Sequence, residues 1–179
     1  MVFWRGEGSA SVRFNGQTVQ ADATGGKWAV KLEPMEYGGP YDMEFVLDGK
    51  TVVLKDIYVG EVWFAGGQSN MEMPLFRTEG GLNEAKTALN EKIRFFIVPR
   101  RFKKKVDTFG WHFEKTVEED KAWEICTEQS ALSFTAIGYY VAKGLHEKLG
   151  VAVGVISCNW GSTPIEPYIA RKYFYEHDL

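Results

Sequence analysis

Residues 57–71 read IYVGEVWFAGGQSNM, an apolar run that ends in a pair of glycines and a short polar segment. Its apolar part, Ile57 to Ala65, predicts a strand that is buried on both faces, as strands of a parallel sheet are. The glycines Gly66 and Gly67 then allow a sharp turn, which would present the hydroxyl of Ser69 at the rim of the sheet. Ser69 is therefore the candidate nucleophile.

Composition limits the classes of protein that need to be considered. The chain has 179 residues, of which 45% are hydrophobic and 15% aromatic, so it can form one large or two small packed domains. A net charge of -3 gives no reason to expect nucleic acid or an anionic membrane as a partner, and the basic run 100–105 is interpreted as a solvated loop. No apolar stretch is long enough to span a bilayer. We expect no signal peptide, because MVFWRG lacks the basic start and the long apolar middle of one; the localisation stays open.

Two cysteines are too few for a disulfide framework, so the redox compartment also stays open. Cys158 ends an apolar run, which predicts a buried free thiol, and Cys126 is the other cysteine.

Two regions with different sequence patterns follow one another. Short alternating runs between residues 9 and 55 are separated by turn pairs, and Asn15-Gly16 and Asp48-Gly49 predict tight antiparallel hairpins. After Asp56, apolar runs alternate with helical patterns, which indicates an α/β layer with a parallel sheet. The expected strands are 59–65, 93–98 and 151–158, and the expected helices are 82–90 and 133–149. The sequence thus predicts a β-rich region over 1–56 and an α/β region over 57–179.

A second glycine-containing loop, residues 159–166, follows the strand predicted at 151–158. Ligands of open α/β sheets bind beyond the carboxyl ends of the strands, so this loop and Ser69 should face one crevice if their strands are neighbours. The backbone N–H of Gly161 would then suit an oxyanion that forms at Ser69. His146, beside the apolar stripe of the helix 133–149, is interpreted as a structural histidine.

Several segments together resemble the sialate O-acetylesterases and related carbohydrate esterases of the SGNH hydrolase superfamily. They are residues 60–75, 134–140, 145–151, 153–156 and 160–168. The resemblance implies a sandwich-like accessory region at 1–56, followed by the N-terminal part of a three-layer, flavodoxin-like SGNH hydrolase domain. It also implies that Ser69 is the nucleophile and that the N–H groups of Ser69 and Gly161 form the oxyanion hole. In the same two loops we expect Gln68, Asn70, Thr163 and Glu166 to contact the substrate.

The sequence also departs from the family pattern. Ser162 stands where a second glycine is usual, and Tyr168 replaces a common tryptophan. The family's later blocks, of the Gln-Gly-Glu and Asp-x-x-His types, are absent, so the catalytic His and Asp are missing from this chain. His112 and His177 lack the spacing needed to replace them. The sequence therefore predicts half of an active site.

The expected activity is hydrolysis of acetyl esters on a carbohydrate through a serine acyl-enzyme, without metal or cofactor. Two alternatives stay open: a non-catalytic fragment or carbohydrate-binding relic, and a hydrolase domain that a second polypeptide completes. The sequence does not identify the sugar. Arg77 and Arg171 are interpreted as surface arginines, with anion binding as the alternative for each.

Overall fold

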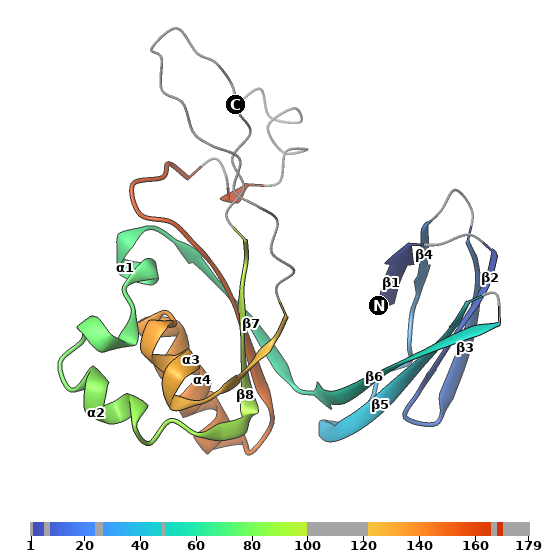
Figure 1. Cartoon of the computed structure of the whole chain (residues 1–179), viewed down its shortest axis with the longest axis horizontal. Coiled ribbons are helices and arrows are strands. Elements are labelled where there is room, and N and C mark those ends of the chain that lie inside the picture. Colours follow the sequence, from blue (N-terminus) through green and yellow to red (C-terminus); the bar gives the residue numbers. More distant parts are fainter. Residues whose placement is uncertain are drawn as a thin grey trace, which may run out of the picture. The chain divides into compact units, whose positions relative to one another are not determined.

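Figure 1 shows the computed structural model, which describes residues 2–5, 8–23, 27–47, 49–99, 122–165 and 168–169. The chain divides into two compact units, Met1–Gly60 and Glu61–Leu179. Each unit has its own hydrophobic core. The boundary expected after residue 56 lies within the last strand of the first unit.

The first unit is an antiparallel β structure, as the turn pairs predict. Its main sheet has the order β3-β2-β5-β6, and β1 and β4 form a separate antiparallel pair. The bounds are β1 Val2–Arg5, β2 Gly8–Phe14, β3 Gln17–Ala23, β4 Lys27–Val30, β5 Gly38–Leu47 and β6 Lys50–Val59. Val30 of β4 shares one buried cluster with Val12 and Phe45 of the main sheet, so both ladders contribute to one core.

The two predicted hairpins are confirmed. Asn15 and Gly16 have positive φ values of 45° and 78° and connect β2 to β3. Leu47 pairs with Lys50 across the second turn, where Gly49 has a φ of 74°, while Asp48 lies outside the described residues. Both turns need backbone conformations that Asn and Gly adopt at low cost.

The apolar run Ile57 to Ala65 does not form the single strand that we expected. The strand β6 ends at Val59 and pairs with β5 in the first unit, whereas β7, Glu61–Gly67, pairs with β10 in the second. Only Gly60 separates the two strands. Both strands contain apolar residues, so the apolar run continues across Gly60. The sequence pattern therefore does not predict that the chain passes from one sheet to another at this residue.

The second unit contains the predicted parallel sheet, with the strand order β7-β10-β8-β9. The strands β10, Val153–Asn159, and β8, Asn90–Ile97, run parallel to β7. The short strand β9, Glu124–Cys126, is antiparallel to β8 and was not predicted.

Helices pack on one face of this sheet (Figure 1). Their bounds are α1 Ser69–Glu72, η1 Leu75–Arg77, α2 Gly81–Ala85, α3 Glu128–Ser133 and α4 Ala136–Leu149. The helix predicted over 133–149 is α4, which begins after the N-cap Thr135 and ends at Gly150, with φ 71°. The helix predicted over 82–90 is too long, because α2 ends at Ala85 and Leu89 is 73% exposed. Within the described residues, no helix combines the length and the apolarity that a membrane crossing requires.

The face of the sheet under α4 carries the core of the second unit. Phe95 of β8 stacks on Phe134 at 4.0 Å between ring centroids, and Val153 and Val155 are fully buried. The opposite face differs from our expectation of burial on both sides, since Val62 and Phe64 of β7 are each 62% exposed.

A polar cluster connects α2 to α4. Glu84 accepts hydrogen bonds from Tyr139 Oη at 2.8 Å and from Lys143 Nζ at 2.5 Å. These two bonds, that of Lys143 first, lower the pKa of Glu84 below its ordinary value. A carboxyl whose pKa is lower in the folded chain stabilises the fold above its unfolded pKa, and this contribution is lost as the pH falls through the folded pKa.

We therefore expect Glu84→Gln to lower the free energy of unfolding by about 1 kcal/mol at neutral pH, a modest value because Lys143 is more than a third exposed. The difference from wild type should shrink as the pH falls below about 4. Urea unfolding at several pH values measures this, with the exposed Glu91→Gln as the matched control. A deficit that stays constant down to pH values near ~3 would contradict the assigned role.

The two thiols differ in accessibility, and not in the way that we expected. Cys158 is only half-buried, whereas Cys126 is fully buried and its thiol donates to the carbonyl of Ala88. Burial raises the pKa of Cys126 to about 11.

We expect Ellman's reagent to modify Cys158 well before Cys126. The variants Cys158→Ser and Cys126→Ser would show which thiol gives the fast reaction and which the slow one. Faster loss of the Cys126 thiol would show that this part of the core opens readily.

Candidate active site

Ser69 lies directly beyond the carboxyl end of β7, as the sequence predicts. The strand ends at Gly67, whose φ of 152° is a conformation that L side chains rarely adopt. A Cβ at this position would also lie 3.1 Å from Cβ of Met71. The chain therefore needs a glycine to turn from the strand into α1, of which Ser69 is the first residue and is exposed.

The second glycine-containing loop lies beside this turn because β10 is the neighbour of β7. Asn159 is paired in register with Gly67, and the N–H of Trp160 donates to the carbonyl of Gly67 at 3.0 Å. A Cβ built on Gly161 would lie 3.7 Å from both Cα and Cβ of Ser69. The two loops therefore face each other at one edge of the sheet.

The N–H of Gly161 is directed at a carboxylate. It donates to Oε2 of Glu72 at 2.5 Å, a bond that joins the loop after β10 to the helix that carries Ser69. Sequence reasoning did not single out Glu72. Its position three residues after Ser69, on the same side of a helical turn, is the only signal that the sequence offers.

Two hydroxyl groups hold the rest of this loop. Tyr168 Oη donates to the carbonyl of Gly67 at 2.6 Å, and Thr163 Oγ1 donates to the carbonyl of Trp160 at 2.6 Å. The two hydroxyl oxygens are 3.0 Å apart. Tyr168, which stands where the resemblance leads us to expect a tryptophan, therefore connects the second loop to the residue where β7 ends.

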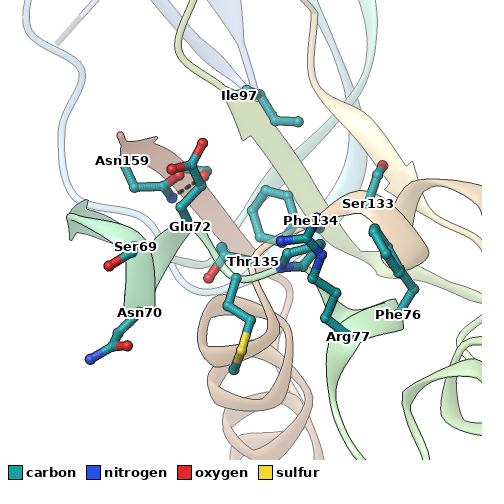
Figure 2. Close-up of a pocket in the computed structure, with 13 residues that line it drawn as sticks. Ser69, Asn70, Glu72, Phe76, Arg77, Ile97, Ser133, Phe134, Thr135 and Asn159 are labelled. Atoms are coloured by element: carbon teal, nitrogen blue, oxygen red, sulfur yellow. Dashed lines mark hydrogen bonds between the residues drawn. The ribbon is translucent and has the colours of Figure 1, made fainter. Parts of the chain in front are cut away.

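A cavity of about 630 Å³ opens beside Ser69 (Figure 2). Its lining includes Ser69, Asn70 and Glu72 from the first turn. Two buried polar groups also line it, Ser157 of β10 and the N-cap of α4, Thr135, at 6% and 3% exposure. The cavity thus has hydrogen-bonding groups in its wall next to the candidate nucleophile.

The structure brings together some of the predicted residues and not others. Ser69 and Asn70 line the cavity, whereas Gln68 and Thr163 do not, and Thr163 uses its hydroxyl within its own loop. Arg77 also lines the cavity, with its guanidinium carbon 5.6 Å from the ring centroid of Phe76. Glu166, Arg171, His112 and His177 lie outside the described residues.

His146, the one histidine in the described ranges, is structural. Its Nδ1 lies 2.6 Å from the carbonyl oxygen of Val151, to which it donates a hydrogen bond beyond the end of α4. No described histidine lines the cavity, and the described residues contain no cluster of His, Cys, Asp and Glu that could hold a metal ion.

Comparisons with known proteins support a relationship to acetylesterases. No protein-family model matches the chain. A crystal structure of a carbohydrate acetylesterase from Xanthomonas citri superposes with a TM-score of 0.83 and 30% identity, over 97% of this chain and 39% of that one. Sialate O-acetylesterase from Rattus norvegicus is 27% identical over 157 residues, and the Homo sapiens protein of that name is 27% identical over 156 residues. The chain is related to the sialate O-acetylesterases.

The matches to the sialate O-acetylesterases cover 81% of this chain but only 28% of each relative. The chain therefore spans little more than a quarter of the length of these relatives.

Ser162, which stands where the resemblance leads us to expect a glycine, occupies a left-handed conformation. Ser162 has a φ of 64°, a value that is unfavourable for any residue with a Cβ.

We expect Ser162→Gly to raise the free energy of unfolding by about 0.5–1 kcal/mol, as measured by thermal or urea unfolding. Ser162→Ala is the matched control and should bring no gain, because it keeps the Cβ. Equal stabilisation by both variants would mean that the hydroxyl, not the backbone, is unfavourable.

Proposed function

We propose that the chain carries the nucleophile of a carbohydrate O-acetylesterase, Ser69, and two of its oxyanion donors, the N–H groups of Ser69 and Gly161. The observation that supports this most directly is the N–H of Gly161, which binds an anionic oxygen of Glu72 beside Ser69. A backbone donor that already holds a carboxylate oxygen has the direction and the space to hold the oxyanion of an acyl-transfer intermediate. The relatives named sialate O-acetylesterase and carbohydrate acetylesterase support an acetyl ester on a sugar as the substrate.

In the proposed mechanism, Ser69 Oγ gives its proton to a base and forms a bond to the acetyl carbon. The N–H groups of Ser69 and Gly161 hold the oxyanion, and the bond to the sugar oxygen then breaks as that oxygen takes the proton. Water releases acetate from Ser69 in the second half of the reaction. The resemblance implies that the base is a histidine of an Asp-x-x-His block, which this sequence does not contain.

The exposed apolar face of the β7-β10-β8-β9 sheet supports the proposal that the chain is part of a larger hydrolase domain. The register places Val62 and Phe64 of β7 on the same face as Ile156 of β10, opposite the face that α4 covers. Burying apolar side chains such as these is favourable, by about 25 cal/mol for each Å² removed from water. We propose that they belong to a three-layer SGNH domain, of which residues 57–179 form the N-terminal part and which a further polypeptide segment completes. Residues 1–56 would be an accessory region.

The second candidate function is that of a non-catalytic fragment or carbohydrate-binding relic. It is favoured by one observation, that no histidine among the described residues lines the cavity beside Ser69. In that case the cavity binds a sugar, and no proton is removed from Ser69.

Hydrolysis of 4-nitrophenyl acetate and of an acetylated sugar by the chain separates the two functions. Because this sequence does not contain the proposed base, the assay also includes the polypeptide segment that supplies it, and we then expect turnover that Ser69→Ala reduces by about 10³-fold or more. Ser133→Ala, which removes another hydroxyl from the same cavity, is the matched control and should keep most of the rate. Equal rates for wild type and Ser69→Ala would contradict the catalytic role, and binding of the sugar without turnover would favour the relic.

A further inference from the structure

The bond between Gly161 and Glu72 has a consequence for the proposed site. A backbone N–H carries one hydrogen, and in this structure that hydrogen is directed at Oε2 of Glu72. The proposed function requires the same N–H for an oxyanion that forms at Ser69. The carboxylate of Glu72 and the oxyanion therefore compete for the same donor, the N–H of Gly161.

The geometry leaves little room for both groups. A Cβ placed on Gly161 would lie 2.8 Å from Oε2 of Glu72 and 3.7 Å from Cβ of Ser69, so the carboxylate and the nucleophile flank one short piece of backbone. Glu72 reaches this point because it follows Ser69 by three residues within α1, which places both side chains on neighbouring positions of one turn.

Charge adds to the competition. An ionised carboxylate that accepts a hydrogen bond from an amide is a stronger acceptor than a neutral carbonyl oxygen such as that of an ester. An oxyanion that forms beside it would also meet a like charge at close range, and the cavity wall gives less screening than bulk water. Glu72 must therefore leave the Gly161 N–H before that donor can stabilise the intermediate.

We propose that Glu72 is a built-in competitor for the oxyanion donor of Gly161. Its carboxylate holds the donor while the site is empty and sets the affinity of that donor for carboxylates and tetrahedral oxyanions. This inference rests on the proposed function, because it assigns the Gly161 N–H to substrate oxygen. It makes Glu72 a residue that limits binding at the reacting centre.

Acetate, the product of the proposed reaction, is a suitable probe, because its carboxylate can take the place of that of Glu72. The experiment follows the Gly161 amide resonance in chain labelled with ¹⁵N-glycine, identified by its loss in Gly161→Ala. Sodium acetate is titrated at constant ionic strength into wild type, Glu72→Gln and Glu72→Ala. The exposed Glu79→Gln, which removes one negative charge from the turn between η1 and α2, is the matched control.

Without acetate, Glu72→Gln should move the Gly161 amide proton upfield, because a neutral amide oxygen is the weaker acceptor. The acetate concentration at half-response should be lowest for Glu72→Ala, intermediate for Glu72→Gln and highest for wild type. Between Glu72→Ala and wild type we expect a difference of about tenfold. Glu79→Gln should behave like wild type.

Three outcomes would overturn the inference: the same acetate response in all variants, no response in any, or weaker binding by Glu72→Ala than by wild type. The last would mean that Glu72 only holds the loop in place. The readout does not depend on turnover. If Ser69-dependent ester hydrolysis is observed but the Gly161 amide resonance and its acetate response are the same with and without the Glu72 carboxylate, the proposed function stands and the inference is rejected. A graded acetate response without Ser69-dependent hydrolysis would support the competition and reject the proposed function.

Discussion

The pairing of β7 with β10 is the constraint on which the candidate site depends. Parallel strands in register end at the same edge of a sheet, and here Gly67 and Asn159 are the last residues of their strands and are partners. The carbonyl of Gly67 then receives two donors from the second loop, the N–H of Trp160 and the hydroxyl of Tyr168. The positions of Ser69 and Gly161 follow from this pairing, since each comes two residues after the end of its strand.

The elements that the sequence predicted well are those set by local chemistry. The Asn15-Gly16 hairpin depends on two residues that tolerate positive φ, and α4 has its N-cap at Thr135 and its end at Gly150. The turn that presents Ser69 was predictable for the same reason, because Gly67 adopts a conformation that other residues avoid. The parallel strands were recognised by their continuous apolar runs.

Elements set by distant partners were not predicted. The change from one sheet to the other at Gly60 is not visible in the sequence, because the strands on both sides of it are apolar. The strand β9 has only three residues, too few to show the alternation of apolar and polar residues that is typical of a strand. The bond from Gly161 to Glu72 joins residues 89 positions apart, so no local pattern could reveal it. Ser162 is an intermediate case, because its departure from the family pattern pointed to strain and its φ of 64° lies in the disfavoured region.

The strand order also bears on how the sheet can assemble. The strand β10 comes last of the four along the chain, yet it lies between β7 and β8. Until β10 docks, β7 and β8 have no partner in each other, and pairing over such a separation carries a loop-closure cost that slows folding. During synthesis the turn that carries Ser69 would therefore emerge long before the strand that gives it a neighbouring loop. The site beside Ser69 can exist only after the centre of the sheet has been filled.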